Sequence, residues 1–418
     1  MKIFEYITRY CKKRKKQFMA FGIFSFWVWG CSVLSPYVLG KYIDKLVEIE
    51  VINTILMFTC TLFMINFSKN IIGYLSDLIS TKLINEIAFN IKFDIFKRLK
   101  RVPLNYFKDK DSVYLSERIN KDSDEIVTFY FRNLFKLMLE FFTIIIGFLY
   151  LYFLNHLISY MLIIIFPIYV AFYKIFKTPM YNAQLEFKEN SSMYHSCANI
   201  QFAKIRYIKL NVLFEYVDKL IINAFSKAYH SLIKYFKISY IFTNLEMFFV
   251  EIINIFILFY GGVLVYKQEI SIGSFVTINS YCAMIIEAIK YFIEYGASYQ
   301  QTMVSFNRII ELENIDVETN GTNIIDNIKC IKGCNLCIKI AENQILNDIN
   351  IIFNENQISL IKGKNGVGKT TLINVIAGLY IDEYKGLIYY DDLEIHNIDM
   401  YKFREKHISF VEQEPGFL

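Results

Sequence analysis

Residues 363–370 read Gly363-Lys-Asn-Gly-Val-Gly-Lys-Thr370, which fits the pattern G-x-x-x-x-G-K-[ST]. Residues 357–362 before it are strand-like, and residues 370–377 after it carry apolar side chains at helical spacing. A phosphate-binding loop needs this order, because its glycines let backbone N–H groups point at phosphate oxygens and the helix start is electropositive. Lys369 can then reach the β- and γ-phosphates, and the Thr370 hydroxyl can bind Mg²⁺. The alternative is a glycine turn before a structural helix.

The chain outside this loop is unusually apolar. Of 418 residues, 55% are hydrophobic and 20% are charged. A soluble chain carries roughly 25% charged and 45–50% apolar residues, so the composition predicts a membrane domain and excludes a disordered chain. Six runs are long enough to cross a hydrocarbon layer of about 30 Å; they lie at residues 17–40, 51–75, 135–154, 157–176, 238–266 and 270–296. A cleaved signal peptide is the alternative for the first run, and the length of the run disfavours it.

Basic residues give the orientation of these spans. The first sixteen residues are strongly basic, which predicts a cytosolic N-terminus, and six spans then return the C-terminus to the cytosol. Residues 154–156 are expected to form a tight turn between two spans. The long loops at 76–134 and 177–237 have apolar residues at helical spacing, so we expect them to be cytosolic extensions of the membrane helices.

The composition changes at Glu311, where an acidic, Asn-rich stretch begins. We interpret it as a linker between two domains. The expected architecture is an α-helical membrane domain of six transmembrane helices with long cytosolic extensions, followed by part of an α/β P-loop nucleotide-binding domain. The boundaries are 1–310 for the membrane domain, 311–328 for the linker and 329–418 for the nucleotide-binding part.

Three of the eight cysteines, Cys330, Cys334 and Cys337, form a C-x3-C-x2-C pattern. This spacing can hold an iron–sulfur cluster, although no second motif accompanies it. The alternative is a chance cluster on neighbouring strands that lead into the second domain. Nothing in the cysteine pattern indicates an oxidising compartment.

Six spans followed by this loop resemble a half-transporter of the ATP-binding cassette (ABC) exporter family. Residues 365–372 and 377–379 are similar to the cassette version of the phosphate loop, and residues 386–391, Arg404 and 408–413 follow the family's spacing. The resemblance implies that Gln413 is the catalytic Q-loop glutamine, and that Thr370 and Gln413 bind Mg²⁺. It implies that ATP is held by Gly363, Lys364, Asn365, Gly366, Val367, Gly368, Lys369, Thr370 and Thr371.

Four segments of the membrane half also resemble the family. Residues 35–36 with Gly40 and Asp44 resemble the end of span one, and residues 272–276 resemble the start of span six. Residues 102–107 with Arg118 and Asp122 resemble the first coupling segment, which docks on the cassette, and residues 308–312 resemble the cytosolic end of span six.

The sequence departs from the family at three places. Val113 stands where the family usually has glycine, and Ile340 stands where many members stack an aromatic ring on adenine. The printed sequence ends five residues after Gln413, whereas the family's signature loop, catalytic glutamate and switch histidine would lie beyond that point. We therefore expect the chain to be one truncated half of a dimer.

The resemblance implies ATP-driven export of an amphipathic solute (peptide, lipid or drug) by alternating access, with ATP and Mg²⁺ as cofactors. The expected partners are a second half-transporter, the lipid bilayer and the solute. The net charge of +5 gives no argument for nucleic acid. We expect a multi-pass protein of the plasma membrane with both termini in the cytosol. The alternatives are a non-hydrolysing nucleotide-binding membrane subunit paired with an active half-transporter, and an importer, which the fusion of both domains disfavours.

Acidic residues in the spans are the hints about the solute. Glu251 is expected about 20 Å into span five, where a carboxylate is costly unless it faces a wet cavity or a partner. It is therefore either a neutral, hydrogen-bonded structural group or a cavity-lining contact for a cationic solute. Glu287, Lys290 and Glu294 share one helix stripe near the cytosolic edge, where a structural ion pair is expected.

Overall fold

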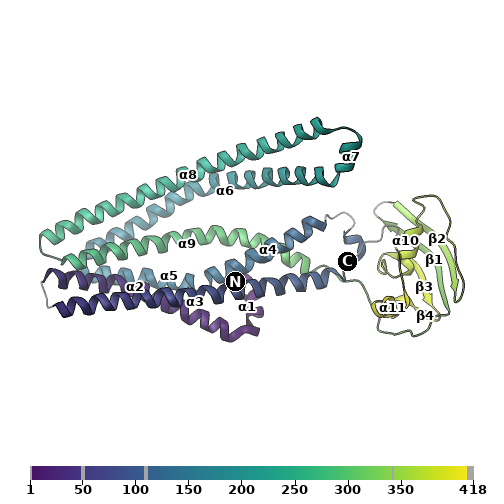
Figure 1. The fold of residues 1–418 in the computed structure, drawn as a ribbon, viewed down its shortest axis with the longest axis horizontal. Helices are drawn as coiled ribbons and strands as arrows, with labels where there is room; N and C mark the ends of the chain where they lie inside the picture. The colour runs from purple at the N-terminus through teal and green to yellow at the C-terminus, as the bar shows by residue number, and fades with distance from the viewer. Residues whose placement is uncertain (1, 49–51, 108–111, 341–342, 412–418) are drawn as a thin grey trace. The chain divides into compact units, whose positions relative to one another are not determined.

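Long helices make up most of the computed structural model (Figure 1), which describes residues 2–48, 52–107, 112–340 and 343–411. The chain divides into two compact units. The helical unit comprises Lys13–Leu83 and Tyr130–Gln300, and the mixed unit comprises Met1–Lys12, Ile84–Phe129 and Gln301–Leu418. The helices that precede the sheet are α1 (Lys2–Cys11), α2 (Lys15–Val47), α3 (Ile52–Leu99), α4 (Ser112–Asn133), α5 (Lys136–Leu154), α6 (His156–Ala203), α7 (Ile205–Leu210), α8 (Phe214–Tyr266) and α9 (Ile272–Glu313).

Within the described residues, five helical stretches are long and apolar enough to cross a membrane. They contain the expected spans in α2, α3, α5, α8 and α9. The run expected at 157–176 lies in α6, several of whose side chains are outside what the structure describes. The helices continue well past the apolar runs, so most of each long loop expected to be a helical extension is helical, with non-helical residues after α3 and between α7 and α8. α9 ends at Glu313, so the first residues of the expected linker belong to this helix.

One non-helical residue, Asn155, separates α5 from α6. Its backbone is extended, and its side-chain oxygen accepts hydrogen bonds from the amides of Leu157 (3.0 Å) and Ile158 (3.2 Å). These amides are free donors at a helix start, so Asn155 is an N-cap. The tight turn predicted at this position is confirmed.

Apolar packing holds the helical unit together. α6 and α8 run side by side and are joined through the short α7 (Figure 1). Ile278 and Cys282 of α9 are fully buried against residues of α5, α6 and α8, including Leu151 and Ile253. Burial of such aliphatic side chains contributes about 1.5–3 kcal/mol each in a water reference state.

The mixed unit contains a four-stranded antiparallel sheet. Its strands are β1 (Cys330–Ile340), β2 (Asn343–Asn354), β3 (Tyr384–Tyr390) and β4 (Leu393–Glu394), in the order β2-β1-β3-β4. α10 (Lys369–Ile376) and α11 (Met400–His407) pack on this sheet (Figure 1). Leu372 and Val375 of α10 and Phe403 of α11 enter one core with the buried side chains of β1 and β3.

The strand expected immediately before the phosphate loop is not formed, so that prediction is wrong. Residues 357–362 have no strand assignment. Leu360 is 75% exposed and Ile358 is fully exposed. A β-strand needs a hydrogen-bonded neighbour, and among the described residues no strand pairs with this segment. Ile358 and Leu360 therefore lack a covering layer in the described structure, whereas Ile361 is partly buried against the core of the mixed unit.

The cysteine pattern does not form a metal site in the described part of the chain. Cys330, Cys334 and Cys337 all lie on β1, not on neighbouring strands. The Cys337 sulfur accepts a hydrogen bond from the Asp348 amide at 3.2 Å. No group of three potential metal ligands was found among the described residues. The iron–sulfur alternative is therefore not supported, and the cysteines are strand residues.

Candidate functional site: the phosphate loop and the membrane pocket

The glycines of the phosphate loop have the backbone that a phosphate cradle requires. Gly366 and Gly368 have φ values of 82° and 97°, in the region that favours glycine over all other residues. At Gly368 a Cβ would also lie 2.8 Å from Ile345 Cγ2. At Gly363 it would lie 2.8 Å from Val367 Cγ1. An alanine at Gly368 would therefore be strained by both conformation and contact.

The Lys369 ammonium group points back into the loop. It donates hydrogen bonds to the carbonyl oxygens of Gly363 (2.8 Å) and Lys364 (2.9 Å). The ammonium group therefore lies where the loop would hold phosphate oxygens, and its positive charge would attract them. The loop is exposed along residues 363–367, and Thr370 at the first turn of α10 is exposed as well.

α10 starts directly at the loop. Gly368 is its N-cap, and the Leu372 amide donates to the Gly368 carbonyl at 2.8 Å. The first amides of this helix therefore face the loop and favour an anion there. Leu372 and Val375 hold the helix in the core, which fixes the direction of its N-terminus.

Three predicted positions lie wholly or partly outside the described residues. Gln413 is one of them, so its placement near Mg²⁺ stays a prediction. Ile340 pairs with Asn343 through the backbone, and Val113 lies in α4, but their side chains are not described.

Two family-like segments more than 200 residues apart meet in the helical unit. The Asp44 carboxylate accepts hydrogen bonds from the Gly273 amide (2.7 Å) and the Ser271 hydroxyl (2.9 Å). A Cβ at Gly273 would lie 1.9 Å from the Gly40 carbonyl oxygen. The end of α2 and the start of α9 are therefore in backbone contact, and Asp44 caps α9.

Two other family-like segments meet in the mixed unit. The Arg118 guanidinium on α4 forms an ion pair with Glu311 of α9 at 2.7 Å and lies 3.9 Å from Asp122. It also donates to the Arg308 carbonyl at 3.3 Å. The residues predicted for the first coupling segment and for the end of span six thus contact one another.

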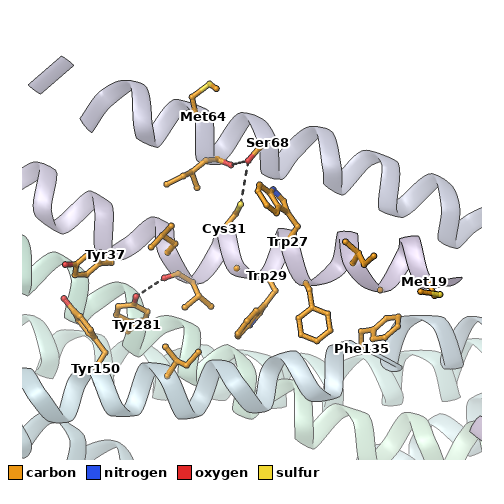
Figure 2. A pocket seen from close by; sticks show the side chains of 18 of the residues that line it. Met19, Trp27, Trp29, Cys31, Tyr37, Met64, Ser68, Phe135, Tyr150 and Tyr281 are labelled. Carbon is orange, nitrogen blue, oxygen red and sulfur yellow. Dashed lines mark hydrogen bonds between the residues drawn. The ribbon is translucent and has the colours of Figure 1, made fainter. Parts of the chain in front are cut away.

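A large pocket lies between α2, α3, α5 and α9 in the helical unit (Figure 2). Its volume is about 1460 Å³, and the described residues that line it include no charged side chain. Much of the lining is aromatic, and Figure 2 shows Trp27, Trp29 and Phe135 among these residues. Two of its polar groups are satisfied internally: Trp29 Nε1 donates to Thr143 Oγ1 at 2.8 Å, and the Tyr281 hydroxyl donates to the Val33 carbonyl at 2.8 Å. The pocket therefore suits an uncharged, apolar group.

Family models match both parts of this architecture. Residues 18–289 match the ABC transporter transmembrane region, and residues 346–418 match the ABC transporter model. The chain belongs to the ABC transporter family. The resemblance inferred from the phosphate loop and the apolar runs is thereby confirmed, as is the fold of a helical membrane domain followed by a nucleotide-binding part.

Relatives of this ABC transporter chain are similar over most of its length. It is 24% identical to the lactococcin-G-processing and transport ATP-binding protein of Lactococcus lactis subsp. lactis, over 92% of this chain and 55% of the relative. It is 22% identical to the pediocin PA-1 transport/processing ATP-binding protein of Pediococcus acidilactici, over 92% and 54%. It is 23% identical to the sublancin-168-processing and transport ATP-binding protein of Bacillus subtilis (strain 168), over 90% and 54%. The chain spans about half the length of these relatives.

Sequence reasoning missed two groups of residues in this ABC transporter chain. The pocket's aromatic residues carried a weak signal, the run Phe26-Trp-Val-Trp29 in the first span. The segment after α9 gave no signal beyond its acidic, Asn-rich composition, which we interpreted as a linker. In the structure its polar residues are hydrogen-bonded, as described below.

Proposed function

We propose that the complete protein exports an amphipathic solute by alternating access, driven by ATP hydrolysis. The observation that carries this proposal is the folded glycine loop with Lys369 turned into it, in a chain whose apolar helices match an ABC transporter membrane region. ATP closing two cassettes would move the membrane helices, and hydrolysis would reset them. The printed names of the relatives include both transport and ATP binding, which favours an exporter over a non-hydrolysing subunit.

The loop supports a specific assignment of nucleotide contacts. The backbone amides of residues 363–371 would bind the phosphates, and Lys369 would exchange its two carbonyl acceptors for β- and γ-phosphate oxygens. The Thr370 hydroxyl, exposed beside the loop, is the ligand we assign to Mg²⁺, together with Gln413. Mg-ATP supplies the phosphoryl group whose transfer to water provides the driving energy.

We infer that the solute is a peptide with an apolar portion, in preference to a lipid or a drug. The relatives' names refer to lactococcin, pediocin and sublancin processing and transport. The uncharged aromatic lining of the pocket would receive apolar side chains of such a solute.

We propose the predicted boundaries, 1–310 for the membrane domain, 311–328 for the linker and 329–418 for the nucleotide-binding part, with the difference that α9 extends three residues into the linker, to Glu313. A second half-transporter would complete the working dimer. We place the protein in the plasma membrane with both termini in the cytosol, on the basis of the basic N-terminal segment.

The test is nucleotide binding and transport by the full-length protein in proteoliposomes. In Lys369→Ala, one ammonium–phosphate contact of about 4 kcal/mol is lost, so the Kd for Mg-ATP should rise roughly a thousandfold and transport should cease. Lys362→Ala is the matched control, because Lys362 is an exposed lysine just before the loop. An unchanged Kd in Lys369→Ala would contradict the assignment of the phosphate loop.

A further inference from the structure

A polar cluster joins three parts of the mixed unit: the chain just after α3, the segment after α9, and α11. The Glu318 carboxylate accepts a hydrogen bond from the Arg404 guanidinium at 3.2 Å, and both side chains are largely buried. The Glu318 amide donates to the Arg101 carbonyl at 2.8 Å. The guanidinium groups of Arg101 and Arg404 lie 5.8 Å and 5.2 Å from the centroid of the Tyr401 ring. We call Arg101, Glu318, Tyr401 and Arg404 the relay cluster.

The electrostatics of the relay cluster tie its members to one another. Burial and the neighbouring Glu318 carboxylate together raise the pKa of Tyr401 to about 12. Tyr401 therefore stays neutral and keeps its ring available to both cations at neutral pH. A largely buried ion pair depends strongly on geometry, because displacing one partner leaves the other uncompensated.

The segment that carries Glu318 is held from both sides. The Thr319 amide donates to Asp382 at 2.9 Å, and the Asn320 side chain donates to Asp399 at 2.9 Å. The Asn320 side-chain oxygen in turn accepts from the Met400 amide at 2.8 Å. Glu318 is therefore anchored directly beside the N-terminus of α11.

A neighbouring face of α11 packs against β3, which contacts the helix that begins with Lys369. The Phe403 ring packs edge-on against Tyr390 with ring centroids 4.6 Å apart. The Tyr390 hydroxyl donates to the carbonyl of Ile376, the last residue of α10. Met400 lies close to Gly378, where a Cβ would be 2.9 Å from Met400 Cε. Tyr401 and Arg404 of α11 thus belong to the relay cluster, whereas Phe403 and Met400 connect α11 to the C-terminal end of α10 through Tyr390 and through Gly378, which follows that helix.

We propose that Glu318 and Arg404 are coupling residues outside the nucleotide site: they hold α11 to the chain after α3 and so set how strongly the solute changes ATP hydrolysis. The inference rests on the proposed function. α3 is apolar enough to span a membrane, and Arg101 follows its last residue by two positions. A displacement at the end of α3 moves the Arg101 carbonyl, and with it Glu318, Arg404 and α11. Packed and hydrogen-bonded groups thus connect the end of α3 to α11. Whether they transmit a displacement is tested by measuring the coupling between solute and ATP hydrolysis in variants.

The experiment measures solute-stimulated ATP hydrolysis and transport per ATP in the full-length protein in proteoliposomes. In Glu318→Gln the basal hydrolysis rate and the KM for ATP should stay within about threefold of the wild type, whereas stimulation by solute and transport per ATP should fall roughly tenfold, a factor equivalent to about 1.4 kcal/mol of coupling. The charge-swapped pair Glu318→Arg with Arg404→Glu should recover part of the loss, which separates lost pairing from misfolding.

A matched control exists on the same helix. Lys406 of α11 forms an ion pair with Asp326 at 3.4 Å, but both side chains are mostly exposed, so Lys406→Gln should leave coupling at the wild-type value. Wild-type coupling in Glu318→Gln, or an equal loss in Lys406→Gln, would overturn the inference. If Lys369→Ala also hydrolyses ATP at the wild-type rate, the proposed function fails and the inference fails with it. If Lys369→Ala is inactive, those same outcomes overturn the inference alone.

Discussion

Replacing Gly273 by alanine tests the contact between α2 and α9. Gly273 lies in the first turn of a helix, where alanine is intrinsically better than glycine by about 1 kcal/mol. Helix propensity alone therefore predicts that Gly273→Ala stabilises the protein. The structure predicts the opposite, because the added Cβ would lie 1.9 Å from the Gly40 carbonyl oxygen and 2.6 Å from the Asp44 carboxyl carbon.

The magnitude follows from what must move. Relieving the clash separates the two backbones and lengthens the hydrogen bond from the Gly273 amide to Asp44, which is 2.7 Å long. Losing a hydrogen bond to a charged group costs about 2 kcal/mol, and overpacking adds about 2 kcal/mol. Because alanine regains about 1 kcal/mol of helix propensity, the free energy of unfolding should fall by about 3 kcal/mol in total. For a unit of this size that corresponds to a Tm lower by roughly 6–12 °C.

The assay is thermal unfolding of the purified full-length protein in detergent, followed by intrinsic tryptophan fluorescence. Trp27 and Trp29 both lie in α2, the helix that carries Gly40 and Asp44, so their fluorescence reports on the unfolding of that helix. Gly296→Ala is the control in the same helix, since no described atom lies within 4 Å of a Cβ at that position. A Tm for Gly273→Ala equal to or above that of Gly296→Ala would refute the argument that the α2–α9 contact needs glycine.

Three further predictions concern other parts of the chain. Gly30→Leu places a side chain in the pocket at a position where no described atom lies within 4 Å of the added Cβ, so transport of bulky apolar solutes should fall while basal ATP hydrolysis persists. Gly262→Leu, whose added Cβ is equally unobstructed but which lies outside the pocket lining, should transport normally. Glu251, exposed on α8, should contact cationic solutes, so Glu251→Gln should lower their transport roughly tenfold with basal hydrolysis intact, and unchanged transport and stimulation would make it structural. Asp399→Ala removes the N-cap of α11 and should cost about 1 kcal/mol, seen as a lower Tm. The hydrogen bond from Asn320 holds the pKa of Asp399 below its usual range, so this Tm difference should be complete at neutral pH and shrink as the pH falls below about 3.9.

The features that sequence predicted well are those set by neighbouring residues. The glycines at 366 and 368 need positive φ, Lys369 follows them directly, and Asn155 caps the helix that begins at the next residue. Each depends on a few consecutive positions, which a motif states completely. The apolar runs are similar, because the length of an uncharged run is itself the physical requirement.

The features that sequence could not predict depend on distant partners. Asp44 caps a helix that starts more than 200 residues later, and nothing local to Asp44 indicates this contact. Glu318 looked like one more acid in a polar segment until the structure placed Arg404 beside it. The wrong strand prediction at 357–362 has the same cause, because a strand is defined by its neighbour and not by its own apolar residues.

The one-residue turn at Asn155 has a consequence for how the protein is made. The connection between α5 and α6 is too short to form a polar loop that stays in water while the two helices insert one after the other. If α6 spans the membrane, as the run at 157–176 predicts, the two helices would be integrated together, as a hairpin whose tip crosses the hydrocarbon layer. The Asn155 side chain accepts hydrogen bonds from the amides of Leu157 and Ile158. Without these bonds, each amide would cross the hydrocarbon layer with no hydrogen-bond partner, at a free-energy cost of several kcal/mol. The Asn155 side chain, at the junction of α5 and α6, thus lowers the free-energy barrier to inserting the two helices into the membrane.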